Sequence, residues 1–378
     1  MENISFLLGA GFSIPEGYKG VKELNKTFVD LKSNDFSIDT DGTLGLGNQH
    51  VSSYNKYKPI FIRCLKYYTF FRQFDYERFF DFLKTNEVGP NIIFKMYLHW
   101  LRKKNGLDYG HEEVVSKMIN FLNQLVFEFL THPKSIKLKN QYINKPNYPN
   151  YNGFLNTIQN LQSNGAAINF HTLNHDLLFE KLMNSAWLQN NYSDGFTKCN
   201  TPFYGIDHAG KKVHLAYFDG NYSKQIKLFK LHGSFDYYPY RLKNSKKIDR
   251  YIKVDFNISN SNLFKNVTNP SIEESNDFGN YHSDFLSGTT SKIGRYNETF
   301  YSELLGHFKN NLKNSERLII IGYGCSDSEI NKLIEENFKF KPVTIINPKP
   351  GIKVKQFARN LNARLLEKNI DDMTMDDI

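Results

Sequence analysis

Cysteine and arginine are both scarce in this chain of 378 residues. Its three cysteines, Cys64, Cys199 and Cys325, are far apart and odd in number, so they form neither a disulfide framework nor a CxxC metal pair. Arginine supplies only 10 of the 48 cationic residues. Because arginine is the better bidentate reader of phosphates and bases, the net charge of +9 is weak evidence for nucleic-acid binding. The 38 Lys and 43 Asn instead resemble the output of an A/T-rich coding sequence, and we expect no direct nucleic-acid binding.

Long hydrophobic runs are also missing. No stretch approaches 18 consecutive apolar residues, so we expect no membrane-spanning segment and no membrane partner. The N-terminus lacks the charged start and longer apolar core of a signal peptide, which favours a cytoplasmic location. With 40% hydrophobic and 23% charged residues, the composition is that of a soluble globular protein.

Five short apolar runs end in Gly, Asn, Asp or His and predict buried parallel strands. They are Ile4–Leu8, Ala166–Phe170, Ile226–Leu231, Leu318–Ile321 and Pro342–Ile346. Helical patterns follow several of them, such as Ile330, Leu333, Ile334 and Phe338 behind the fourth. Strands that alternate with helices predict an α/β fold with a Rossmann-like, doubly wound parallel sheet.

Between the first two strands, apolar residues recur at helical spacing, for example Phe61, Cys64, Leu65 and Tyr68. We interpret residues 51–150 as an inserted all-helical module, and residues 1–50 and 151–378 as the α/β core. The aromatic stripes of the helical module indicate helix–helix packing rather than a ligand site. Ser33–Ser53 and Asn257–Gly288 look irregular, and loops this long are usually functional lids or disordered segments. The acidic tail 370–378 is expected to be solvated.

Ligands of open α/β sheets bind beyond the carboxyl ends of the strands, so the polar residues there should converge. After the first strand, Gly9, Ala10, Gly11 and Ser13 could let backbone N–H groups approach a pyrophosphate. Any tight strand-to-helix turn also favours glycine. The third Gly of GxGxxG and the Lys of a Walker loop are both missing.

The other strand ends carry further candidates. Asn174 and Asp176 could bind ribose hydroxyls and a water, although both residue types also cap helices. His232 has a side chain suited to proton transfer near neutrality, whereas a lone His is more often a satisfied polar residue. Four more candidates follow the last two strands: Gly322, Ser326, Asp327 and Asn347.

Taken in order, these motifs resemble the sirtuin family, and specifically the sirtuin-like domains of bacterial anti-phage defence proteins. The matching segments are GAGFS (9–13), TLNHD (172–176), KLHGS (230–234), SGTTSKIGRY (287–296), IIIGYGCSD (319–327) and IINP (345–348). The resemblance implies a domain that binds NAD⁺ as its substrate and cleaves the nicotinamide–ribose bond. It also implies catalytic roles for Asn174, His232 and Asp176. Gly9, Ala10, Gly11, Ser13, Gly322, Ser326, Asp327 and Asn347 would bind the dinucleotide.

Two departures from the family's protein deacylases matter. Deacylating sirtuins carry a zinc module held by four cysteines, which three scattered cysteines cannot supply, so we expect no zinc. The segment after GAG also lacks the SGIPDFR run of deacylases. Both favour an NAD⁺ hydrolase that depletes NAD⁺ as an abortive-infection effector. A zinc-independent deacylase and a non-catalytic sensor of NAD⁺ or ADP-ribose remain alternatives. The resemblance further implies a homo-oligomer, or a separate sensor such as a HerA-like ATPase.

Overall fold

The computed structural model describes most of the residues of the chain. They are 2–38, 44–46, 53–87, 91–131, 147–185, 188, 191–207, 209–241, 248–255, 258–265, 283–286, 295–296 and 298–378. The chain divides into two compact units. The first comprises Met1–Glu16, Tyr142–Phe285 and Glu298–Ile378, and the second comprises Gly17–Gln141 and Leu286–Asn297.

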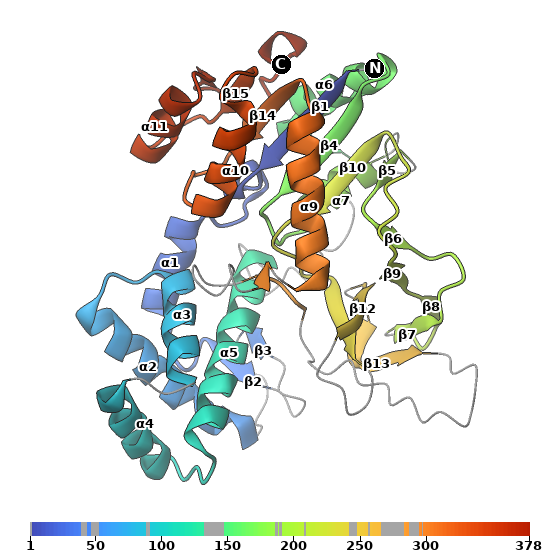
Figure 1. Ribbon diagram of the computed structural model, residues 1–378. Helices are drawn as coiled ribbons and strands as arrows, with labels where there is room; N and C mark the ends of the chain where they lie inside the picture. The colour runs from blue at the N-terminus through green and yellow to red at the C-terminus, as the bar shows by residue number, and fades with distance from the viewer. Residues whose placement is uncertain are drawn as a thin grey trace. The chain divides into compact units, whose positions relative to one another are not determined.

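A seven-stranded sheet of parallel pairs forms the centre of the first unit (Figure 1). Its order is β16-β15-β14-β1-β4-β10-β5. The strands are β1 (Asn3–Leu8), β4 (Ala167–Thr172), β5 (Tyr192–Ser193), β10 (Ile226–Lys230), β14 (Arg317–Ile321), β15 (Val343–Ile346) and β16 (Arg364–Leu366). All five predicted strands are present, so the α/β prediction is confirmed. The short edge strands β5 and β16 were not predicted.

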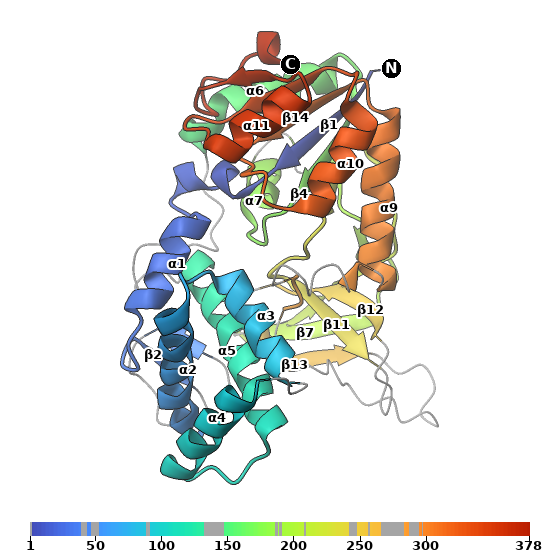
Figure 2. The same ribbon diagram turned by 60° about the vertical axis from the view of Figure 1, so that its left-hand side comes forward.

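Helices cover both faces of this sheet (Figures 1 and 2). Phe6 and Phe170 lie on one face, where they contact Phe154 of α6 (Asn152–Ser163) and Phe179 of α7 (Leu178–Asn184) respectively. His171 lies on the opposite face and packs against Phe308 of α9 (Thr299–Asn314). The unit also contains α10 (Ser328–Phe338) and α11 (Ile352–Asn360). The sheet is therefore doubly wound, as the alternation of strands and helices predicts.

The strand order fixes where a ligand site can form. The chain runs outward from β1 through β4 to β10, and then returns to place β14 on the other side of β1. The order reverses between β1 and β14, which makes their carboxyl ends the topological switch point. The glycine loops GAG (9–11) and GYG (322–324) begin at these two ends.

Two antiparallel sheets complete the first unit. One has the order β11-β12-β9-β6, and the other has the order β13-β7-β8. Their strands are β6 (Phe196–Thr197), β7 (Phe203–Asp207), β8 (Lys212–His214), β9 (Ala216–Phe218), β11 (Tyr237–Arg241), β12 (Ile248–Lys253) and β13 (Ile258–Lys265). Strand β13 shows that part of Asn257–Gly288 is regular, which corrects the expectation of one irregular loop.

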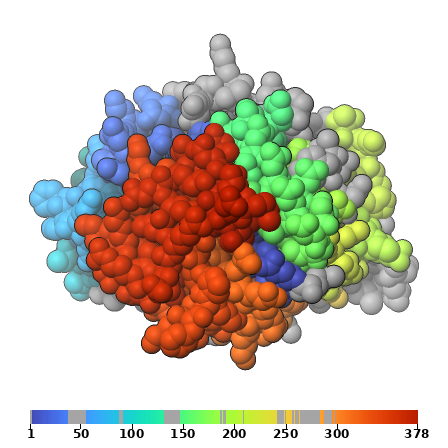
Figure 3. Space-filling view, turned by 90° about the horizontal axis from the view of Figure 1, so that it is seen from above, coloured from blue at the N-terminus to red at the C-terminus, as the bar shows by residue number. Residues whose placement is uncertain are grey.

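The C-terminal tail is not the solvated end that its acidic sequence suggested. Ile370 and Met373 are buried. Asp377 forms a capping box with Thr374 and an ion pair of 2.6 Å with Lys368. Figure 3 shows this end of the chain lying against the segment around α6, where a Cβ on Gly153 would be 2.2 Å from the Asp371 carbonyl oxygen. The apolar side chains of Ile370 and Met373 therefore dock the tail.

The second unit contains five α-helices and the hairpin of β2 (Phe36–Ile38) and β3 (Leu44–Leu46) among its described residues. The helices are α1 (Val21–Asp30), α2 (Lys58–Phe71), α3 (Tyr76–Glu87), α4 (Ile92–Lys104) and α5 (His111–Thr131). Aromatic rings pack between them, as when Phe61 contacts Phe79 and Phe121. The unit begins at Gly17, whereas the sequence suggested a limit near residue 50; the domain limits stay a prediction. The hairpin lies inside Ser33–Ser53, so that segment is not wholly irregular.

Candidate functional site

The two glycine loops at the switch point touch through their backbones. Gly9 N–H donates to the Ile321 carbonyl at 3.0 Å, and Gly11 N–H donates to the Gly322 carbonyl at 2.8 Å. A Cβ on Gly11 would lie 2.7 Å from Gly322 Cα, and Gly322 has a φ of +63°. Glycine is therefore required here by close packing and a left-handed backbone.

Most backbone amides of the predicted phosphate-binding loop form hydrogen bonds within the chain. Phe12 N–H donates to the Gly9 carbonyl and Ser13 N–H donates to the Ala10 carbonyl, so four of the five amides from Gly9 to Ser13 have partners within the chain. A phosphate-binding role for Gly9, Ala10, Gly11 and Ser13 stays a prediction, and it is not needed to explain the glycines.

Three of the predicted residues form one hydrogen-bonded cluster. The Ser13 hydroxyl donates to Asp176 Oδ2 at 2.9 Å. The Asn174 amide lies 3.0 Å from the Gly9 carbonyl and 3.1 Å from the Ser13 hydroxyl, with Nδ2 as donor. Asp176 also accepts from Leu178 N–H at 3.0 Å. The loops after β1 and β4, which are neighbouring strands, bring these side chains together.

Burial raises the pKa of the Asp176 carboxyl. The ammonium of Lys230 and the hydrogen bonds from Leu178 and Ser13 oppose this effect without cancelling it. Raised carboxyl pKa values in polar clusters are a feature of functional sites, although structural networks also produce them.

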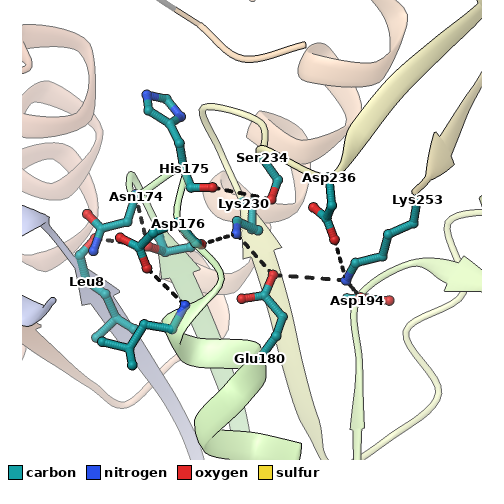
Figure 4. A network of polar contacts seen from close by, with 12 residues as sticks. Leu8, Asn174, His175, Asp176, Glu180, Asp194, Lys230, Ser234, Asp236 and Lys253 are labelled. Atoms are coloured by element: carbon teal, nitrogen blue, oxygen red, sulfur yellow. Dashed lines mark hydrogen bonds and ion pairs between the residues drawn. The ribbon is translucent and has the colours of Figure 1, made fainter. Parts of the chain in front are cut away.

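A network of buried charged residues lies next to this cluster (Figure 4). Lys230 lies on β10 with its side chain fully buried, and its ammonium donates to the Asp176 carbonyl at 2.5 Å and to Glu180 at 3.0 Å. Lys253 of β12 lies 2.6 Å from Asp194, 3.6 Å from Asp236 and 4.0 Å from Glu180. The network therefore connects the site loop to the antiparallel sheet.

The carboxylates decide the protonation of Lys253. Burial alone would lower the pKa of its ammonium, but Asp194, Asp236 and Glu180 outweigh burial and hold that pKa well above its ordinary value. Lys253 is therefore charged at neutral pH, as a lysine among three carboxylates should be.

His232 is buried and faces a carboxylate. Its Nε2 lies 3.4 Å from Asp327 Oδ2, and its ring centroid is 6.2 Å from that of His175. Asp327 caps α10, where its Oδ1 accepts from Ile330 N–H at 3.2 Å. Figure 4 shows the His175 side chain pointing away from the lysine network. Two histidines and one aspartate thus lie at the same edge of the sheet as Ser13 and Asn174.

Other predicted residues have local contacts only. Ser326 is exposed, and its hydroxyl lies 3.5 Å from the Gly324 carbonyl. The Asn347 side chain accepts from Lys349 N–H at 3.1 Å, within its own loop. Both follow strands of the sheet, so they lie at its carboxyl edge, but no contact joins them to Ser13 or His232 among the described residues. Most of SGTTSKIGRY, residues 287–294, lies outside the described residues.

Sequence reasoning missed Lys230, Glu180 and Lys253. A lysine that ends an apolar strand, as Lys230 does, is an available signal, because such a residue is seldom buried without a partner. No comparable signal marks Glu180 or Lys253, since each has the sequence surroundings of a solvent-facing residue.

Neither metal-binding nor membrane-spanning features occur in the described part of the chain. No group of three His, Cys, Asp or Glu residues there could hold a metal ion. All three cysteines are free, with Cys64 and Cys325 buried and Cys199 exposed. No described helix is long and apolar enough to cross a membrane.

Comparison with known proteins gives little beyond the geometry. No protein-family model matches the sequence, and no curated protein matches it. A solved structure described as "Structural Basis for the Mechanism and Regulation of Sir2 Enzymes" has 10% identity and a TM-score of 0.37, with 98% of this chain and 88% of that chain covered. Another, described as "The Structural basis of Sirtuin Substrate Affinity", has 12% identity and a TM-score of 0.35, with 98% and 90% covered. Similarity this low supports no conclusion about function.

Proposed function

We propose that this protein is an NAD⁺ hydrolase of the sirtuin-like type, which cleaves the nicotinamide–ribose bond to give ADP-ribose and nicotinamide. The observation that carries the proposal is that two groups of polar side chains lie at the carboxyl edge of one parallel sheet. One group is Ser13, Asn174 and Asp176, and the other is His232 with Asp327. Their motifs are the ones on which the resemblance to sirtuins rests.

Loss of nicotinamide leaves positive charge on the ribose, so catalysis requires a group that stabilises this charge and a group that accepts a proton. Asp176 is suited to the first task, because its carboxylate is held by Ser13 and Leu178. His232 is suited to the second as the general base for a ribose hydroxyl or a water. Asn174 would orient the ribose hydroxyls or the attacking water.

We also propose which residues contact the phosphates and the adenosine half of the dinucleotide. Ser13 with the Gly9–Gly11 backbone would bind the phosphates, and Gly322, Ser326, Asp327 and Asn347 would line the adenosine half.

The test is incubation of the purified protein with NAD⁺ alone, followed by chromatography and mass spectrometry of the products. We expect nicotinamide and ADP-ribose from the parent protein. His232→Ala should lower the rate by about 10²- to 10⁴-fold, which is the usual contribution of a general base. A folded His232→Ala variant that consumes NAD⁺ at the parent rate would contradict the mechanism.

Adding an acylated peptide separates hydrolysis from the alternatives. Cleavage of NAD⁺ without the peptide supports the hydrolase, whereas cleavage only in its presence identifies a zinc-independent deacylase. Calorimetric binding of NAD⁺ or ADP-ribose without any nicotinamide release identifies a sensor.

An NAD⁺ hydrolase must be restrained in its host, so we further propose that assembly gates it, as a homo-oligomer or with a separate partner such as a HerA-like ATPase. Large apolar side chains on α2 and α4 support this part, including Phe70, Ile92 and Met96, each more than half exposed. Exposed apolar groups of this kind mark interaction surfaces. A strict monomer in light scattering after size-exclusion chromatography would count against self-assembly. The proposed biological role is NAD⁺ depletion during anti-phage abortive infection.

A further inference from the structure

We propose that Asp327 is a positioning residue for His232, which orients the imidazole and raises its affinity for a proton. This inference deepens the proposed function and rests on it. It assigns Asp327 a task that differs from lining the adenosine half of the site. The His232 and Asp327 side chains are 5% and 17% exposed, and Nε2 lies 3.4 Å from Oδ2.

The contact joins the loops of two strands that are not neighbours in the sheet. His232 follows β10 and Asp327 follows β14, and these strands are separated in the sheet by β1 and β4. Three strand spacings of about 4.8 Å amount to roughly 14 Å. The two loops must therefore lean toward each other across the ends of β1 and β4. Those ends carry Ser13 and Asn174, so the pair forms beside the proposed reaction centre.

The Asp327 carboxylate is held in place by its own helix. Its Oδ1 accepts from Ile330 N–H at 3.2 Å, and its backbone N–H donates to the Tyr323 hydroxyl at 3.2 Å. That hydroxyl also lies 2.9 Å from Asn331 Oδ1. An N-cap needs only one carboxylate oxygen, and Oδ2 is the oxygen that faces His232. A helix N-terminus also favours a negatively charged cap.

Three other titratable groups lie near His232 in the described part of the chain, and each has contacts of its own. His175, from the loop after β4, is a second imidazole at 6.2 Å between ring centroids. Asp284 precedes Phe285, which bridges to Gly233, and its carboxylate accepts from the Tyr251 hydroxyl at 2.5 Å. The Lys230 ammonium is directed to Glu180 and the Asp176 carbonyl. Asp327 contacts His232 directly, with Nε2 and Oδ2 3.4 Å apart.

A carboxylate beside Nε2 has two consequences for a histidine base. It favours the neutral tautomer with hydrogen on Nε2, so Nδ1 becomes the basic nitrogen. It also stabilises the imidazolium that forms when Nδ1 takes a proton, which raises the imidazole pKa. Orientation and proton affinity are both properties that a general base requires.

Asp327→Asn is the decisive variant. Asparagine keeps an oxygen for Ile330 N–H and is itself a favoured N-cap, but it removes the charge opposite His232. We expect kcat for NAD⁺ hydrolysis to fall about 10- to 100-fold, a part of what a general base contributes. A base works when neutral, so activity rises with pH through the imidazole pKa. Loss of the carboxylate lowers this pKa, and the acidic limb of kcat should move to lower pH by about 1 to 3 units.

The pairing itself can be measured without any reaction. Nitrogen-15 NMR of histidine-labelled protein, with the His232 signals assigned by a His232→Gln variant, should show hydrogen on Nε2 and a lower pKa in Asp327→Asn. The parent spectrum alone tests the tautomer, should the variant fold poorly. Glu329→Gln is the matched control, because it removes the same charge from the same first turn of α10. Glu329→Gln should change neither the tautomer of His232 nor the acidic limb of the pH profile of kcat.

An unchanged His232 pKa in Asp327→Asn, or hydrogen on Nδ1 in the parent, would overturn the positioning role. A loss of thermal stability with an unmoved acidic limb would also overturn it, since a cap alone would give that result. If the parent protein releases no nicotinamide, the proposed function fails while the NMR titration still decides the pairing. Parent hydrolysis with no NMR shift would overturn this inference and leave the proposed function intact.

Discussion

The Ser13 hydroxyl donates to the Asp176 carboxylate at 2.9 Å, although the two residues are 163 positions apart in the sequence. This contact joins the loop after β1 to the loop after β4, and Asn174 closes the cluster by donating to Ser13 at 3.1 Å. Each of the three side chains has a hydrogen-bond partner in the chain. A preorganised polar group at a strand end is what a substrate with several hydroxyls requires.

Asn174→Ala should lower turnover more than it lowers NAD⁺ affinity. The amide is expected to act on the ribose hydroxyls or the water during bond cleavage, and loss of one such donor costs about 10²- to 10³-fold in rate. Single-turnover kinetics and calorimetric binding measure the two quantities separately. Asn360→Ala, on the exposed part of α11, is the control. Equal losses of rate and affinity would make Asn174 a binding residue only.

Gly11→Ala should destabilise the first unit, because its Cβ would lie 2.7 Å from Gly322 Cα. Overpacking of this kind costs about 1 to 3 kcal/mol in the free energy of unfolding. Gly324→Ala, in the partner loop, is the matched control, since a Cβ there meets nothing within 4 Å. Denaturant unfolding of the two variants measures the difference. Equal stability would mean that the GAG glycine is retained for a ligand and not for packing.

Lys253→Met should destabilise the protein by about 3 to 5 kcal/mol, because it leaves Asp194, Asp236 and Glu180 buried without their cation. Lys355→Met breaks a pair with Glu367 whose side chains are 47% and 55% exposed, and it should cost less than about 1 kcal/mol. Urea unfolding at neutral pH compares the two. Adding Asp194→Leu to Lys253→Met should recover part of the loss, and a double variant that is less stable still would contradict the charge argument.

His171 should make the protein less stable as the pH falls. Burial between Phe229 and Phe308, with a smaller contribution from His307, lowers the pKa of its imidazole from 6.5 to about 3. Between these values the unfolded chain binds a proton that the folded chain excludes. Stability should therefore be full above the unfolded pKa and decline by about 1.4 kcal/mol per pH unit below it.

His171→Phe should flatten this dependence between pH 5 and about 6.5, a range in which few carboxylates titrate. Denaturant unfolding at several pH values measures the slope. Asn311→Ala removes the amide that lies 3.4 Å from the ring and keeps the titrating group, so it should lower stability without changing the slope. A parent slope unchanged by His171→Phe would refute the assignment to this imidazole.

The sequence by itself determined the central sheet and the residues at its edge. Apolar runs such as Ile4–Leu8 and Leu318–Ile321 are short, continuous and followed by Gly, which is the local requirement for a buried strand that turns into a ligand loop. Whether a segment forms a strand depends largely on residues that are neighbours in the chain. The apolar pattern of a buried strand can therefore be recognised in the sequence. The same logic placed Asn174, His232 and Asp327 at one edge of the sheet.

Only the tertiary structure decided which of these side chains meet. The contact of His232 with Asp327 depends on two loops leaning over β1 and β4, and strand order is not encoded in local periodicity. The buried cations Lys230 and Lys253 are likewise hidden in sequence, because a charged residue has the same local pattern whether solvent or a distant carboxylate neutralises it. The docking of the C-terminal tail was also not visible in the sequence. Ile370 and Met373 are buried, although the acidic composition of the tail predicts exposure to solvent.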